Sequence, residues 1–374
     1  MKLFERGPSE PYRFLFPWGV ASGFMGLILW FGFQAGLISF YPRQGHANIM
    51  YFGFLWSFIA GFLMTAVPKM TGTPLANRLE ILLAMGFVGI QIVVNYLNQV
   101  PASILLFLIQ TTFLLVFIGR RFLQKRRLPF EGFLFIPFAF FQAILAVILF
   151  LTYSSFSMNT FYLLAGEAFV LNLVVGVGTR LIPVLSRLPN SFTPDQKSNS
   201  NDFLSMIILA IFLNIGFIVQ AFYNDQAGVA IRFFVVMYIA FKYFKITSTV
   251  STKSFVGFGL RAGVLFIISS YGIQLFQPVQ MLAVQHLIYI GGFVLITFMV
   301  GTRVMLAHGG QNLEYETQSS RIGGVALLFA LASILRLLAG ADAYGTVMKL
   351  GILLFIAASF LWFHKFIKIL KGPA

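Results

Sequence analysis

The chain has 374 residues, of which 59% are hydrophobic and 10% are charged, and its mean hydropathy is +0.87. A soluble domain needs a far larger polar fraction to cover its surface, so this composition predicts an integral membrane protein. The absence of cysteine from the sequence excludes disulfides, thiolate metal ligands and a cysteine nucleophile. A redox centre would therefore depend on histidine, methionine, carboxylates or a bound cofactor.

Apolar runs long enough to cross a bilayer recur along the whole chain. A span needs ~20 such residues, and on this basis we predict about twelve transmembrane helices. In chain order they cover 14–40, 47–67, 80–98, 103–119, 133–152, 160–184, 203–223, 228–245, 257–276, 281–306, 322–340 and 345–369. The first run follows a polar lead and has no small-residue cleavage site, so we do not interpret it as a removed signal peptide. The predicted fold class is all-α, with residues 1–374 as a single transmembrane domain.

Lysine and arginine gather at alternate ends of the predicted helices. They precede the first helix and follow every even-numbered one, whereas the connections 98–102, 153–159, 224–228 and 277–280 contain neither residue. Because positively charged loops are retained in the cytoplasm, this pattern predicts a multi-pass protein of the bacterial inner membrane with both termini cytoplasmic. The same distribution accounts for the net charge of +15, so we do not expect nucleic-acid binding.

The second, sixth and tenth predicted helices end in similar sequences. Residues 177–183 read VGTRLIP, residues 300–306 read VGTRVML, and the second helix ends with Gly61 followed by TAVPK at 65–69. Helices four apart with similar ends suggest three parallel four-helix units. The alternative is that glycine and arginine recur at inner helix ends because glycine permits close packing and arginine reaches the interface.

The four histidines differ in predicted depth. His46 opens the second helix and His286 lies a few residues into the tenth, so both imidazoles are expected near the outer side. Two imidazoles at matched depth on separate helices suit a haem iron that is ligated on both faces; the alternative is two unrelated interfacial histidines. His308 follows the inner end of the tenth helix, as a second metal or proton site or as a solvated loop residue. His364 is expected at the inner interface.

Glu167 is the clearest carboxylate within a predicted span, about two turns into the sixth helix. Ionisable residues within spans are costly and are functional candidates by default. Glu167 could relay protons or form an ion pair, with Asn172 nearby on the same helix; the alternative is a protonated carboxyl bonded to a neighbouring helix. Arg43 and Arg232, near the outer ends of the second and eighth helices, could hold haem propionates or anchor the interface.

Three motifs resemble those of one known family. Residues 45–54 (GHANIMYFGF) and 59–72 (IAGFLMTAVPKMTG) resemble the signature helix of the NnrS family, H-A-H-E-M-x-F-G-F followed by A-G-F-L-x-T-A-V-P-x-W-T-G. Residues 178–183 (GTRLIP) are similar to its G-G-R-x-I-P element. The stretch that begins at His286 and ends with TRVMLAHGG at 302–310 is similar to its third motif.

This resemblance implies a haem- and copper-containing membrane protein linked to nitric oxide or denitrification stress. The same helices also resemble the core of haem–copper oxidases and nitric oxide reductases, in which three four-helix arcs surround the cofactors. There the second and tenth helices ligate a low-spin haem, which corresponds here to His46 and His286. The family's second histidine and its glutamate in the second helix are Asn48 and Ile49 in this chain.

These departures favour one haem over a binuclear centre. The sixth and seventh helices carry no histidine, so the three-histidine copper site of the oxidases cannot be built and copper is the weaker expectation. The absence of a CxxCH motif indicates haem b. We therefore expect an NnrS-like protein that acts in electron transfer, nitric oxide binding or sensing, with a quinol or a cytochrome as electron donor.

Two other interpretations stay open. Twelve spans with both ends inside are common in secondary transporters, in which Glu167 would be the coupling carboxylate and haem would be absent. A non-catalytic assembly factor for a haem–copper enzyme would also lack a second metal site. Whether the chain is an enzyme is not decided by its sequence.

Overall fold

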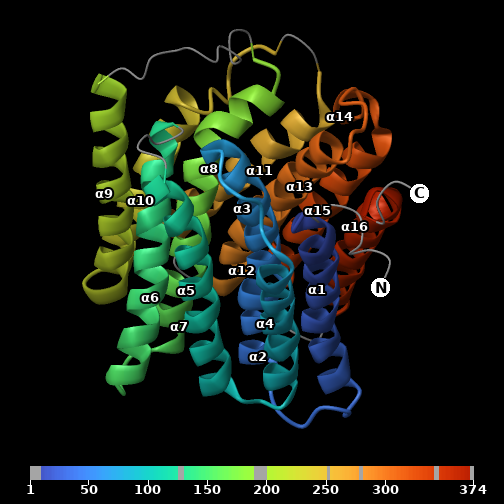
Figure 1. The fold of residues 1–374 in the computed structure, drawn as a ribbon. Coiled ribbons are helices and arrows are strands. Elements are labelled where there is room, and N and C mark those ends of the chain that lie inside the picture. The colour runs from blue at the N-terminus through green and yellow to red at the C-terminus, as the bar shows by residue number, and fades with distance from the viewer. Residues whose placement is uncertain are drawn as a thin grey trace. The chain divides into compact units, whose positions relative to one another are not determined.

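The computed structural model describes residues 10–124, 130–188, 200–250, 253–277, 281–340 and 345–370 (Figure 1). Within these ranges the regular structure is helical and no strand is present. In chain order the helices are α1 (Tyr12–Gln34), α2 (Arg43–Asn48), η2 (Ile49–Leu55), α3 (Trp56–Thr71), α4 (Arg78–Tyr96), α5 (Val100–Gln124), η3 (Glu131–Leu134), α6 (Phe135–Thr152), α7 (Met158–Phe161), η4 (Tyr162–Ala168), α8 (Phe169–Leu185), α9 (Ser200–Phe222), α10 (Asp225–Lys242), α11 (Phe255–Phe276), α12 (Met281–His286), η5 (Leu287–Val294), α13 (Leu295–His308), α14 (Tyr315–Gln318), α15 (Ser320–Leu338) and α16 (Thr346–Leu370).

Eleven helical runs in the described ranges are long and apolar enough to cross a membrane. Three of them are composite, because α2, η2 and α3 form one run, as do α7, η4 and α8, and α12, η5 and α13. Large apolar side chains such as Phe141, Phe212 and Leu265 are exposed on the helices, as expected where lipid replaces water. The prediction of an all-α, polytopic membrane protein is confirmed.

The remaining predicted span, 228–245, corresponds to α10. This helix has 18 residues and includes Asp225, Arg232 and Lys242, so it is shorter and more charged than a simple hydrophobic span. Some of the lysines and arginines that underlie the predicted orientation, among them Lys2, Arg126 and Lys197, lie outside the described residues.

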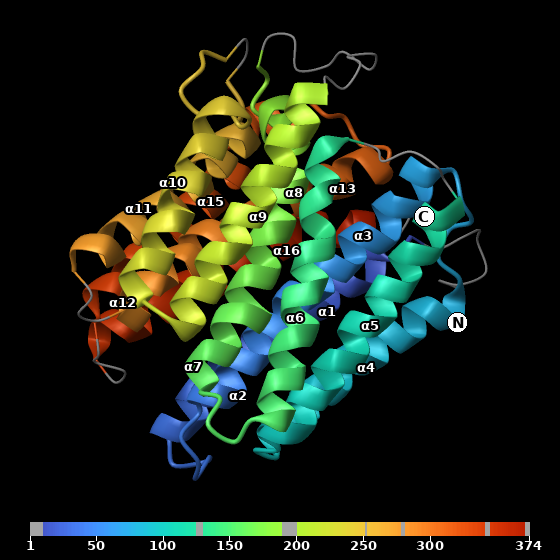
Figure 2. The same cartoon turned by 90° about the vertical axis from the view of Figure 1, so that its left-hand side faces the viewer.

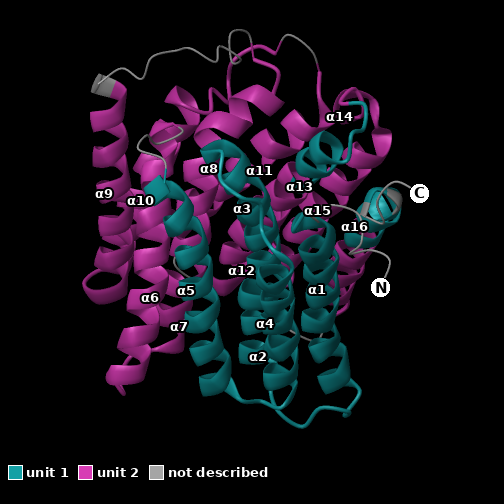
Figure 3. Ribbon diagram, viewed as in Figure 1, with its two compact units in different colours: residues 1–127, 301–312, 359–374 teal, residues 128–300, 313–358 magenta. Residues whose placement is uncertain are grey.

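Contacts divide the chain into two compact units (Figure 3). Unit 1 comprises residues 1–127, 301–312 and 359–374, and unit 2 comprises residues 128–300 and 313–358. The single transmembrane domain over residues 1–374 stays a prediction.

In unit 1, α1 packs against α3 and α4, and α3 packs against α5 (Figure 1). A Cβ atom on Gly61 would lie 2.8 Å from the Phe16 ring, so glycine permits the close approach of α3 to α1. At the ends of these helices, Arg13 Nη1 donates to the carbonyl oxygen of Ile369 at 2.9 Å. The N-terminal end of α1 therefore lies beside the C-terminal end of α16.

In unit 2, α9 and α10 lie side by side with their backbones in contact (Figure 2). A Cβ atom on Gly228 would lie 2.6 Å from the carbonyl oxygen of Gly216 and 2.5 Å from the backbone nitrogen of Gln220. Small residues at a crossing allow such an approach between membrane helices. The crossing also places Arg232, one turn after Gly228, inside the unit, where it is fully buried.

We expect Gly228→Ala to destabilise the protein, because the added methyl group would meet backbone atoms that cannot move aside. Overpacking of this kind costs about 1–3 kcal/mol, which thermal unfolding in detergent can measure. Gly119→Ala in α5 is the matched control, since a Cβ atom there meets no atom within 4 Å. Equal stability of the two variants would contradict the proposed close crossing.

Candidate functional site

Three of the membrane-spanning runs contain a π-helical segment. These segments are η2 in the second predicted span, η4 in the sixth and η5 in the tenth. In a π-helix the backbone hydrogen bonds span one residue more than in an α-helix, and such segments are rare and frequent at functional sites. They occur in the three spans whose ends have similar sequences. This gives the suggested internal repeat a structural counterpart, while the three four-helix arcs stay a prediction.

Each π segment adjoins a residue that the sequence analysis selected. His46 lies three residues before η2, Glu167 lies within η4, and His286 immediately precedes η5. The candidate residues therefore lie beside irregular helical turns, His46 in unit 1 and Glu167 and His286 in unit 2.

His46 is half-buried in unit 1, and its Nδ1 atom lies 2.9 Å from the carbonyl oxygen of Gly26. Its ring meets that of Trp30 edge-on, with centroids 6.0 Å apart. A carbonyl oxygen can only accept, so Nδ1 of the neutral ring carries the proton and Nε2 carries the lone pair.

His286 has the same tautomer in unit 2. Its Nδ1 atom lies 2.6 Å from the carbonyl oxygen of Leu282, one turn earlier in α12, and its ring meets that of Tyr289 edge-on at 5.6 Å. A carbonyl oxygen on one ring nitrogen is the usual arrangement of a histidine that binds metal through the other. The pairing of His46 with His286 stays a prediction. Arg43, the first residue of α2, is exposed.

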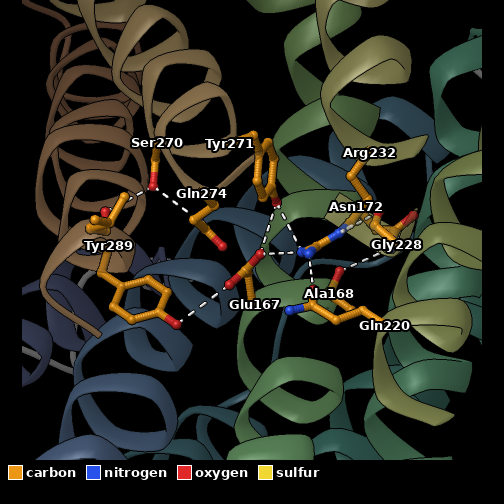
Figure 4. A network of polar contacts seen from close by, with 11 residues as sticks. Glu167, Ala168, Asn172, Gln220, Gly228, Arg232, Ser270, Tyr271, Gln274 and Tyr289 are labelled. Atoms are coloured by element: carbon orange, nitrogen blue, oxygen red, sulfur yellow. Dashed lines mark hydrogen bonds and ion pairs between the residues drawn. The ribbon is translucent and has the colours of Figure 1, made fainter. Parts of the chain in front are cut away.

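Glu167 is at the centre of a buried polar network in unit 2 (Figure 4). Its Oε1 atom accepts hydrogen bonds from Arg232 Nη1 at 2.5 Å and from the Tyr271 hydroxyl at 2.8 Å. Its Oε2 atom accepts one long bond from the Tyr289 hydroxyl, at 3.4 Å. The side chains of Glu167 and Arg232 are each 1% exposed, so the ion pair is shielded from water and lipid alike.

Arg232 is held by more than its ion pair. It donates to the Gln220 side chain of α9 and to the carbonyl oxygen of Gly228 at 3.4 Å. Its guanidinium carbon lies 4.4 Å from the ring centroid of Phe217 and 4.7 Å from that of Tyr271. Aromatic faces attract a desolvated cation, and together these contacts replace the hydration that the buried guanidinium lacks.

Asn172, which we expected beside Glu167, instead exchanges hydrogen bonds with Asn214 of α9. The Asn172 amide donates to Asn214 Oδ1 at 3.1 Å, and Asn214 donates back to Asn172 Oδ1 at 3.0 Å. Its side chain therefore joins α8 to α9, and it also donates to the carbonyl oxygen of Ala168, the neighbour of Glu167 (Figure 4), without bonding to the Glu167 carboxylate itself.

A second polar cluster lies at the helix ends of unit 1. Lys69 donates to the Glu10 carboxylate and to Nδ1 of His308, and His308 Nδ1 lies 3.4 Å from Glu10. Burial raises the pKa of Glu10, but the hydrogen bonds and charges of His308 and Lys69 outweigh it and hold that pKa below its usual value. A lysine ammonium against the ring disfavours a metal ion at His308. Among the described residues, no group of three or more His, Cys, Asp or Glu side chains is placed to hold a metal ion.

The family model described as NnrS protein matches residues 8–373, which is nearly the whole chain. The chain belongs to the NnrS family. This membership suggests a membrane protein related to nitric oxide stress. A search of curated proteins found no match.

Several functional features of this NnrS-family chain were missed by sequence reasoning. Tyr271 and Tyr289 complete the Glu167 network. The only feature of the sequence that could have indicated them is a tyrosine within an apolar span. Arg232, for which we considered a haem propionate or an interfacial role, is the ion-pair partner of Glu167, and this pairing was not predicted. Each π segment contains a glycine, but so do many regular helices of this chain, so a glycine is not a specific sign of a π segment.

The buried pair predicts a non-additive double-mutant cycle. Removing one partner leaves an uncompensated buried charge, so Arg232→Met should cost about 3–5 kcal/mol of unfolding free energy. In Glu167→Gln/Arg232→Met both charges are removed, and we expect it to be more stable than Arg232→Met alone. Thermal unfolding of the purified variants in detergent measures the coupling. Additive effects would contradict the ion pair.

Proposed function

We propose that this NnrS-family chain binds one haem b, with His46 and His286 as its iron ligands, and that it acts in electron transfer, nitric oxide binding or sensing. One observation carries the proposal: in both histidines Nδ1 faces a backbone carbonyl oxygen beside a π segment. Family membership adds the link to nitric oxide stress.

The donor chemistry of the chain fits haem b. Both imidazoles have the tautomer in which Nε2 carries the lone pair that can bind a metal ion. Hydrogen bonding at Nδ1 also raises the basicity of a ligating histidine. With no cysteine in the sequence, covalent attachment of the porphyrin through thioethers is excluded. When bound, haem would supply reversible one-electron chemistry and an iron to which nitric oxide could bind.

The chain's own residues hold and orient the ligand rings. Gly26 and Trp30 fix the His46 ring, and Leu282 and Tyr289 fix the His286 ring. We propose Arg43 as a partner for a haem propionate. Arg232, the other candidate, would first have to leave its pair with Glu167, and the energetic cost of that step supports Arg43.

The residues fit a second metal less well. Asn48 stands where the resemblance places a second histidine, and its buried amide donates to Asn95 Oδ1 at 2.9 Å. An amide engaged in this way is a poor copper ligand. We therefore propose a haem protein without a binuclear centre, with copper as the weaker alternative.

The setting that we propose is the bacterial inner membrane, with both termini cytoplasmic. The alternation of charged and uncharged connections supports this orientation, and the contact of Arg13 with Ile369 supports an even number of crossings. The proposed partners are the lipid bilayer, nitric oxide as a small gas ligand, and a quinol or cytochrome electron donor. Glu167 is the candidate proton relay.

The test is a dithionite-reduced minus oxidised visible spectrum of the protein purified from haem-replete cells. We expect a sharp low-spin b-type spectrum that is lost or converted in both His46→Ala and His286→Ala. His364→Ala is the matched control, because this residue is an exposed histidine of α16 and its variant should keep the wild-type spectrum.

The alternatives predict different outcomes. A wild-type protein without haem would contradict the proposal, and substrate-dependent flux that is lost in Glu167→Gln would then favour a secondary transporter. A stable complex with a haem–copper enzyme, without turnover, would favour an assembly factor.

A further inference from the structure

The two oxygens of Glu167 have unequal partners. Oε1 accepts two short bonds, from the charged Arg232 and from Tyr271, whereas Oε2 accepts one bond at 3.4 Å from Tyr289. Charge-assisted hydrogen bonds are the stronger ones. A proton added to the carboxylate would therefore bind to Oε2, because this disturbs only the weakest of the three hydrogen bonds.

Tyr289 contacts both this buried oxygen and the ring of His286. Tyr271 is fully buried, whereas Tyr289 is only partly buried; Figure 4 shows both beside Glu167. The ring of Tyr289 meets edge-on the ring of His286, which is also partly buried. A phenol hydroxyl both donates and accepts. In the structure the hydroxyl of Tyr289 donates to Oε2. When Oε2 is protonated, this hydroxyl can rotate so that its oxygen accepts a hydrogen bond from Oε2–H.

Protonation of Glu167 changes the charge of the network from zero to plus one, because Arg232 loses its counter-ion. The ionisable groups that face Glu167 are Arg232 from α10, Tyr271 from α11 and Tyr289 from η5. The neighbouring α6 has no ionisable side chain, and the contribution of α9 is the neutral amide of Gln220, through Arg232. No second carboxylate among the described residues joins this network to compensate the charge.

We infer that Glu167 binds a proton at Oε2 and that Tyr289 couples the binding of this proton to reduction of the haem that His286 would ligate. The second half of this inference rests on the proposed ligation of haem by His286. For each electron that a donor such as dithionite would deliver to the proposed haem, one proton from solvent would form the Oε2–H bond, as an O–H bond of hydronium breaks and leaves water. Tyr289 is thus a positioning residue, which keeps its own proton and sets the path and orientation of the one at Oε2.

Infrared spectroscopy tests the proton site without reference to haem. A pH-difference spectrum of the wild-type protein should contain a carboxylic acid C=O band that shifts in D₂O and is absent in Glu167→Gln. The band should move in Tyr289→Phe, which keeps the ring against His286 and removes only the hydroxyl. A wild type without this band, or a band unchanged in Glu167→Gln, would overturn the proton site.

A redox titration tests the link to His286. One proton per electron lowers the midpoint potential by about 59 mV for each rise of one pH unit, and we expect this slope in part of the pH range of the wild type. It should be lost in Glu167→Gln and reduced in Tyr289→Phe. The matched control is Tyr238→Phe on α10, which should keep the slope, because this exposed hydroxyl accepts from Lys242 and lies outside the Glu167 network. A slope unchanged in Tyr289→Phe would overturn the role of Tyr289.

The two measurements also separate this inference from the proposed function. If the purified protein lacks haem, the proposed function and the link fail together, and the infrared band still decides whether Glu167 binds a proton. If haem is present and the slope is the same in Glu167→Gln, the proposed function stands and the link is wrong.

Discussion

The packing of unit 2 depends on a buried ion pair, whose charges hydrocarbon cannot solvate. Glu167 and Arg232 are buried, and each is costly without the other. Their contact requires η4 and α10 to hold one register, and the hydroxyls of Tyr271 and Tyr289 extend the requirement to α11 and η5. The close crossing of α9 and α10 at Gly216 and Gly228 lets the Arg232 guanidinium reach Glu167. One electrostatic constraint thus fixes several helices that are distant in sequence.

The π segments obey the same rule at the level of the backbone, since polar groups within a membrane must find partners inside the protein. Side chains close to each segment supply them. Gln110 donates to the carbonyl oxygen of Phe52 in η2, Asn172 to that of Ala168 in η4, and Ser333 to that of His286 beside η5. Irregular turns therefore persist where polar side chains stabilise them, beside the residues that we propose as functional.

Hydropathy and charge alternation sufficed to predict the class, the approximate spans and the candidate carboxylate, because burial in lipid requires long apolar runs and makes an exception such as Glu167 visible. The ion-pair partner was not predictable in this way. Arg232 lies near the outer end of the predicted span 228–245, where an interfacial arginine is expected, whereas it lies near the middle of α10 (Asp225–Lys242) and is buried where α10 packs against α9 and α11. The π segments escaped prediction because their stability comes from side chains on other helices or further along their own.

We propose that the imidazoles of His46 and His286 ligate one haem iron. Electron paramagnetic resonance of the oxidised protein, prepared with ¹⁵N-labelled histidine, can count these ligands. We expect a low-spin ferric signal with hyperfine coupling to two labelled imidazoles, reduced to one in His46→Ala and to one in His286→Ala. A ferric signal without coupling to both, or coupling that survives both substitutions, would contradict it.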